Sequence, residues 1–128
     1  MYRLIFYRKE NGDSELLEFL EGLRNKAGAS KDARIQFKQI AYCMQLLEEN
    51  GTRLPESITK HLEDDIWELR PGFNRIFYFY HKNDTFVLLH HFRKKSQKTP
   101  RREIDKAKSE RDDFLRREGG RKDNENRK

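Results

Sequence analysis

The sequence predicts an α+β domain: a small, mainly antiparallel sheet of about four strands packed on two N-terminal helices, with one more helix at the C-terminus. Residues 67–95 form three runs rich in aromatic and branched side chains, separated by Pro71-Gly72 and by residues 82–84. Such punctuation is typical of an antiparallel meander. Apolar side chains recur at three- and four-residue steps in residues 30–50, as they do in a helix with one buried face.

The N-terminal half places one strand and two helices before that meander. Residues 2–7 predict a strand, and Ser14 then predicts the N-cap of a short helix over residues 15–23. Ser30 predicts the cap of the longer helix, which should end at Gly51. The apolar stripe of this helix needs a partner, so we expect both helices to cover one face of a mixed sheet in a two-layer domain.

The remaining segments are a connection, a final helix and a tail. Residues 52–65 are mostly polar, and we interpret them as a connection with either one helical turn or one extended stretch. Thr99-Pro100 predicts the start of an amphipathic helix that carries Ile104, Ala107, Phe114 and Leu115. The folded domain should therefore span residues 1–117, and residues 118–128 should form a disordered polar tail.

Positive charge is concentrated in one part of the chain. The 128 residues carry a net charge of +6, with a pI near 9.5. Between Arg70 and Arg102 there are nine lysines and arginines and a single acid, Asp84. A local excess of this size predicts a polyanionic partner, of which nucleic acid fits best.

Cysteine and hydrophobic content limit the compartment and the cofactors. Cys43 is the one cysteine, so no intramolecular disulfide can form, and no Cys/His spacing is typical of a zinc site. The apolar run at the N-terminus is too short for a signal peptide or a membrane span. We therefore expect a cytoplasmic protein with no metal, no cofactor and no membrane association.

Strand alternation predicts where arginines and rings meet. Arg75, Phe77 and Phe79 fall on one side of their strand. If helices cover only one face of the sheet, the other face is half-open and cationic, and it suits the phosphates and unstacked bases of single-stranded RNA. The structural alternative is that Arg70 pairs with an acid, and that Lys94 and Lys95 only protect the end of a strand.

The chemistry that such a surface supports is RNA cleavage without a metal. The motifs of serine hydrolases, P-loop proteins, zinc proteases and dinucleotide-binding proteins are absent from the sequence. In metal-free cleavage the substrate's own 2′-hydroxyl attacks, and the protein orients the backbone, assists proton transfer and stabilises the phosphate charge. His81, His90 and His91 are candidates for proton transfer, and alternation sends one of the adjacent pair to the core.

Several short segments, taken in order, resemble a known family. They are residues 66–71, residues 75–79, and residues 92–100 followed by Ile104 and Ala107. Over nearly all of residues 1–117 the chain resembles the HigB-like, phage-derived branch of the RelE/ParE toxin superfamily. The resemblance implies a type II toxin that enters the ribosomal A site and cleaves mRNA there without a metal or cofactor. It also implies a cognate helix-turn-helix antitoxin and a toxin-antitoxin complex that is a higher oligomer.

The resemblance and the strand pattern together give the candidate site. Arg70, Arg75 and His91 are the candidate catalytic residues, although the identity of the general base and acid stays open. The candidate RNA-binding residues are Arg93, Lys94, Lys95, Lys98 and Phe77.

Two other functions remain open at this point. The superfamily also contains ParE-type inhibitors of DNA gyrase, and a basic patch would serve such an inhibitor equally well. The chain could also be a nucleic-acid-binding module without catalysis, in which case the neighbouring gene would not encode a small helix-turn-helix protein.

Overall fold

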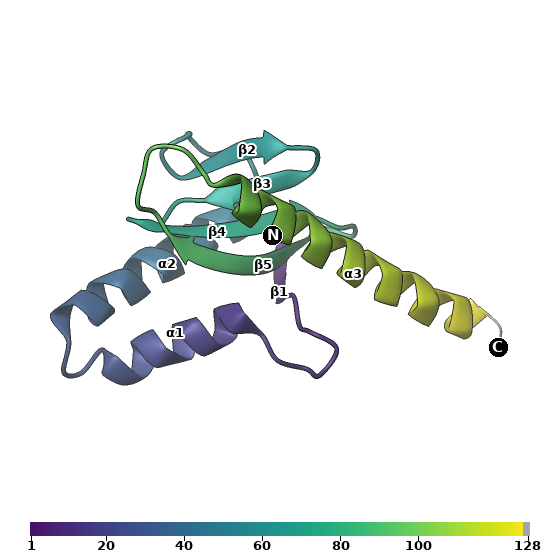
Figure 1. Ribbon diagram of the computed structural model, residues 1–128, viewed down its shortest axis with the longest axis horizontal. Coiled ribbons are helices and arrows are strands. Elements are labelled where there is room, and N and C mark those ends of the chain that lie inside the picture. Colours follow the sequence, from purple (N-terminus) through teal and green to yellow (C-terminus); the bar gives the residue numbers. More distant parts are fainter. Residues whose placement is uncertain (127–128) are drawn as a thin grey trace.

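The computed structural model describes the backbone of residues 1–126 and the side chains of residues 1–118. Three helices and five strands follow one another along the chain (Figure 1). In order they are β1 (Arg3–Phe6), α1 (Glu15–Lys26), α2 (Lys31–Asn50), β2 (Thr59–Glu63), β3 (Ile66–Leu69), β4 (Asn74–Tyr80), β5 (Thr85–Arg93) and α3 (Arg101–Asn126). The α+β class predicted from the sequence is confirmed.

The sheet has five strands in the order β1-β5-β4-β3-β2. β1 runs parallel to β5 at one edge, and the other three pairings are antiparallel. The expectation of about four strands was wrong because the segment at 52–65, interpreted as a connection, contains β2. This strand lies at the other edge and exposes polar side chains, so it lacks the apolar alternation by which strands are found.

Both N-terminal helices begin where the sequence predicts. The hydroxyl of Ser14 accepts a hydrogen bond from the N–H of Leu17, and that of Ser30 accepts one from the N–H of Ala33. These caps satisfy N–H groups that have no partner within the helix. α1 and α2 lie together on one face of the sheet (Figure 1), where they bury a core that includes Leu16, Ile40, Leu47, Tyr78 and Leu88.

The other face of the sheet is covered by α3, so the expectation of a half-open, ring-lined face was wrong. Ala107, Ile104 and Phe114 of α3 pack on a second core that includes Phe77 and Phe79. The domain consequently has three layers, with the sheet between α1 and α2 on one side and α3 on the other (Figure 1).

Charged contacts also hold α3 on the sheet. Glu63, at the end of β2, pairs with Arg101 and Lys108 of α3. On β5, the buried ring of His90 has Nδ1 2.5 Å from Glu110 and Nε2 3.1 Å from Glu103. The helix is therefore anchored both at the β2 edge and over the middle of the sheet.

The C-terminal boundary stays a prediction. The backbone of α3 continues to Asn126. Residues 127–128 of the expected tail lie outside the described residues. No helix in the described part of the chain combines the length and apolar character needed to cross a membrane.

A bulge between β4 and β5 decides the direction of the two adjacent histidines. Ile76 pairs with His91 and Tyr78 pairs with Leu88, so Leu89 and His90 both lie opposite the single residue Phe77. The extra residue turns His90 toward α3 and His91 toward α1. Simple alternation had left the two directions undecided.

Candidate functional site

A buried carboxylate on β3 organises the candidate site. Glu68 is fully buried, and its Oε2 accepts a hydrogen bond from Nε of Arg70 at 3.0 Å. Nε of Arg75 lies 3.9 Å from the same oxygen, and the hydroxyl of Thr99 donates to Oε1 at 2.8 Å. We call these four residues the arginine cluster. One negative charge faces two positive ones, so the cluster keeps a net positive charge.

Arg75 is the buried arginine of the pair. It is 8% exposed, and its Nη1 donates to the carbonyl oxygens of Gly72 (2.8 Å) and Asn74 (2.9 Å). Burial lowers the pKa of Arg75; the carboxylate of Glu68 opposes this shift and the charge of Arg70 adds to it. Gly72 has a φ of +60°, a conformation that glycine adopts without strain, and this turn directs its carbonyl to the guanidinium. Arg75 therefore fixes the β3–β4 turn.

Arg70 is the accessible arginine. Its side chain is 24% exposed, and its Nη1 donates to the backbone carbonyl of Glu56 at 3.0 Å. It lines a groove of about 350 Å³ beside the β2 edge, which we call the outer groove. The outer groove is lined by Lys60, His61, Leu62, Arg70, Gln97, Lys98, Thr99 and Ile104. Three cations on one groove suit a polyanion.

Residues 94–98, the basic segment, belong to the loop between β5 and α3 (Figure 1). Lys94, Lys98 and the arginine pair line one small cavity. The N–H of Lys94 donates to the carbonyl of Phe73 at 2.7 Å, which fixes the start of the segment. The cavity enclosed between segment and arginines measures about 10 Å³, room for roughly one water molecule. A phosphate group does not fit there, so it can reach Arg70 only from the outer groove or after the segment moves.

Two of the predicted site residues lie elsewhere. His91 faces α1, where its ring stacks on Phe19 with 3.6 Å between the ring centroids. Burial, with a smaller contribution from His90, lowers the pKa of His91 to about 4. Phe77 is fully buried beneath α3 and cannot stack on a base in this conformation. The structure thus brings Arg70, Arg75, Lys94 and Lys98 together, without His91 or Phe77.

The basic residues at positions 93 and 95 lie close to this group. Arg93, at the end of β5, directs its guanidinium toward the α2 side, where Nη1 donates to Oε1 of Gln36 at 3.0 Å. Lys95 is exposed within the basic segment. Neither side chain lines the outer groove.

Sequence reasoning missed three residues of this site. Thr99 was expected only to mark the start of the last helix, but its hydroxyl donates to Glu68. Glu68 had a detectable signal, because strand alternation places it on the same side as Arg70, two residues later. Lys60 had none, since β2 itself was not predicted.

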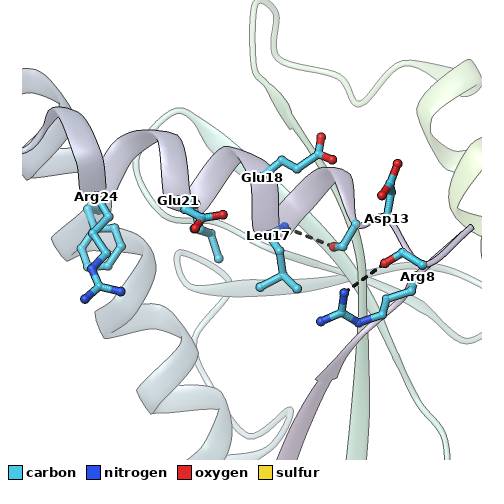
Figure 2. Close-up of a pocket in the computed structure, with 10 residues that line it drawn as sticks. Arg8, Asp13, Leu17, Glu18, Glu21 and Arg24 are labelled. Carbon is cyan, nitrogen blue, oxygen red and sulfur yellow. Dashed lines mark hydrogen bonds between the residues drawn. The ribbon is translucent and has the colours of Figure 1, made fainter.

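A larger hollow lies far from these residues in the sequence and has a different character. It measures about 540 Å³ and lies between residues 8–14 and α1 (Figure 2). Figure 2 shows Arg8 bonded to a backbone carbonyl, that of Gly12, and the acids Glu18 and Glu21 on the same rim. Charges of both signs make this hollow a poor match for a polyanion.

The described residues contain no group of three or more histidines, cysteines or acids that could hold a metal ion. The expectation that the protein uses no metal or cofactor stays a prediction.

Fold and site together define a small α+β protein in which two arginines, Arg70 and Arg75, lie next to the buried carboxylate of Glu68 at one end of the sheet. Residues 28–112, roughly two-thirds of the chain, match the family described as "Phage derived protein Gp49-like (DUF891)". The chain belongs to this Gp49-like, phage-derived family. The matched span includes the arginine cluster and the basic segment.

Comparison with solved structures finds a similar fold in a chain of the "YoeB-YefM complex from Staphylococcus aureus". The TM-score is 0.44 and the sequence identity 12%, over 71% of this chain and 94% of that chain. A likeness at this level says nothing about function. No curated protein sequence matches the chain.

Proposed function

We propose that this protein is the toxin of a type II toxin-antitoxin pair and that it cleaves mRNA on the ribosome. The observation that carries the proposal is the arginine pair on Glu68, with Arg70 open to a groove that also presents Lys60 and Lys98. Membership of a phage-derived family and the resemblance to HigB-like toxins support it.

The proposed reaction is attack by the substrate's 2′-hydroxyl on the adjacent phosphorus. A bond forms between the 2′-oxygen and phosphorus while the bond to the 5′-oxygen breaks, which leaves a 2′,3′-cyclic phosphate and a 5′-hydroxyl. The 2′-hydroxyl gives its proton to water, and the leaving 5′-oxygen takes one up from water. The phosphate gains negative charge in the transition state, and fixed guanidinium groups stabilise that charge. Arg70 supplies this stabilisation in our proposal, with Arg75 and Glu68 holding it in position.

The proposed dependence on the ribosome is supported by how few groups for proton transfer line the site. None of the residues that line the enclosed cavity is a histidine, and His61 is the one histidine at the outer groove. Positioning the 2′-hydroxyl in line with the leaving oxygen is itself a large part of catalysis, and a ribosome that holds the mRNA backbone bent would provide it.

The proposed partners are the ribosome with its mRNA and a cognate helix-turn-helix antitoxin, in a complex of higher order, in the cytoplasm. An acidic segment of the antitoxin could neutralise the basic segment directly. In that case association would be fast and sensitive to salt.

The test is cleavage of a message in a translating extract and as naked RNA. We expect wild-type protein to cut efficiently only in the extract, and Arg70→Ala to cut far less. Lys82→Ala is the matched control, because Lys82 follows β4 at the end opposite to Asn74 and Arg75. Its activity should equal that of the wild type.

Other outcomes contradict the proposal in different ways. Equal cleavage of naked RNA would remove the ribosome dependence. Absence of cleavage in both settings, together with inhibition of DNA gyrase, would identify a ParE-like inhibitor instead.

A further inference from the structure

An aromatic ring stands in solvent at the tip of the β3–β4 turn. Phe73 is 66% exposed, although its backbone is held on both sides. Its carbonyl accepts the hydrogen bond from Lys94, and the N–H of the next residue, Asn74, donates to Pro71 at 3.0 Å. Arg75 binds the carbonyl of Gly72. These bonds hold the backbone of the turn in one conformation, from which the ring of Phe73 extends into solvent.

A cation lies over this ring. The guanidinium carbon of Arg93 is 5.7 Å from the centroid of Phe73. Arg93 is held there by Gln36, whose Oε1 also accepts from the side chain of Asn74 at 3.0 Å. In the other cation–ring contact found among the described side chains, Arg117 lies over Tyr7, whose ring is buried. Phe73 thus combines exposure, a fixed backbone and an adjacent positive charge.

We propose that Phe73 is a stacking platform for an unpaired RNA base, and this rests on the function proposed above. Unpaired bases stack on aromatic side chains, and guanidinium groups add to the interaction. Because Arg93 already lies over one face of the ring, the base would stack on the other face, and the basic segment would bind the neighbouring phosphates. This assigns to the turn the role that the sequence pattern gave to Phe77.

The charge around the ring favours a nucleotide over a protein partner. The guanidinium of Arg93, the last residue of β5, lies over the ring of Phe73. Lys94 and Lys95 follow directly, and the backbone N–H of Lys94 donates to the carbonyl of Phe73, so the basic segment begins beside the turn. An apolar side chain of a partner would gain from the ring but not from the cations. A nucleotide gains from both, because it carries a base and a phosphate on one unit.

The test is binding of a short single-stranded oligoribonucleotide, 2′-O-methylated throughout so that it cannot be cleaved. Phe73→Ala and Phe73→Leu should bind roughly 5-fold to 100-fold more weakly than the full-length wild type, as expected for loss of one stacked base. Phe73→Trp should bind normally, and its added tryptophan emission should be quenched when the RNA binds. An abasic strand of the same length should bind all these variants equally.

Tyr42→Ala is the matched control for loss of an exposed aromatic ring. Tyr42 is 58% exposed on α2, and its removal should leave RNA affinity unchanged. Because neither ring belongs to the core, both variants should keep the wild-type melting temperature.

Three results would overturn the inference. One is normal RNA binding by Phe73→Ala. Another is normal binding by Phe73→Leu with no quenching in Phe73→Trp, which would mean apolar contact without stacking. The third is loss of antitoxin binding alone in the Phe73 variants, which would make the turn a protein-binding surface.

The two proposals fail separately. If wild-type protein cleaves mRNA in the extract while Phe73 variants bind RNA normally, the stacking proposal is wrong and the proposed nuclease activity is supported. If RNA binding depends on Phe73 but the wild type cleaves no RNA, the stacking proposal is supported and the proposed nuclease activity is wrong. A wild type that does not bind the oligonucleotide contradicts the stacking proposal alone, because the proposed nuclease acts on mRNA that the ribosome holds.

Discussion

The hydroxyl of Thr99 donates a 2.8 Å hydrogen bond to the buried carboxylate of Glu68, 31 residues earlier in the chain. It ties the end of the loop that contains the basic segment to the same oxygen pair that holds Arg70. The side chain of Glu68 therefore connects the loop of the basic segment to the arginine pair.

Removing that hydroxyl should loosen the loop. We expect Thr99→Val to lose about 1.5 to 3 kcal/mol of unfolding free energy, the range for a hydrogen bond to a charged group. Thr99→Ser keeps the hydroxyl and should restore most of it. Denaturant unfolding measures the difference, and equal stability of the Val and Ser variants would show that the bond contributes nothing.

Neutralising Glu68 should lower the free energy of unfolding by more than the loss of the Thr99 hydroxyl does. Glu68→Gln leaves two guanidiniums without their counter-charge, and breaking a buried ion pair from one side costs on the order of 3 to 5 kcal/mol. Glu56→Gln is the control, because the side chain of Glu56 is exposed and pairs only with Lys60 in the described contacts. If both variants unfold at the same denaturant concentration, Glu68 does not organise the pair.

The two arginines should fail in different ways. Arg70→Ala should lower the cleavage rate of bound mRNA by roughly 100-fold to 1,000-fold, as for loss of one transition-state donor. Arg75→Ala should also lower the melting temperature, because it frees two backbone carbonyls of the turn. Single-turnover kinetics and thermal melts on both variants separate these effects, and an Arg70→Ala variant with normal single-turnover rates would contradict the assignment.

The lysines of the basic segment should act on binding. Changing Lys94, Lys95 or Lys98 to Ala should flatten the plot of log affinity for single-stranded RNA against log salt by about 0.7 per lost phosphate contact. Lys82→Ala, at the other end of the sheet, should leave the slope unchanged. Should a lysine variant bind normally yet fail to cleave, the catalytic role belongs to the segment.

His91 should make stability depend on pH. Its pKa is lowered to about 4 in the folded protein, against 6.5 ordinarily, so between these values the unfolded chain binds a proton that the folded one does not. Stability should therefore rise with pH from about 4 to 6.5, by less than about 1.4 kcal/mol per pH unit because the ring is partly exposed. Denaturant unfolding of wild type and His91→Phe over this range tests it. The His91→Phe variant should lack this pH-dependent stability. If the plots of unfolding free energy against pH are parallel for the two proteins, His91 is not the cause.

Much of the fold could be predicted from the sequence because its signals are local. Ser14 and Ser30 cap their helices through their own hydroxyls, and the apolar stripe of α2 requires no knowledge of the partner. β2 escaped prediction because an edge strand with exposed polar residues has no such pattern. The placement of α3 depended on a long-range choice between two faces of the sheet, which periodicity does not encode.

The site could be predicted only as a set of charges. The local excess of cations indicated Arg70, Arg75 and the basic segment as site residues, and the structure brings Arg70, Arg75, Lys94 and Lys98 together. Which arginine is exposed depends on how the turn at Gly72 and the carboxylate of Glu68 engage each one. The directions of His90 and His91 depend on a single inserted residue in β5, and the exposure of Phe73 depends on the geometry of a turn. These exposures and directions are set by the folded backbone and cannot be deduced from the type of residue at each position.

The parallel pairing of β1 with β5 has a consequence for synthesis of the protein. Arg3 pairs with Thr85, so the first strand made must wait for the last strand before the sheet can close. Contacts this distant along the chain slow folding, and they leave a strand edge unpaired while the chain is growing. Thr99 follows β5, so the basic segment can fold over the arginine pair only after β5 has been made. A chain whose translation halts within β5 lacks a complete sheet, and one that halts between β5 and Thr99 lacks the hydrogen bond to Glu68. An intact site therefore exists only in chains whose synthesis has passed the basic segment.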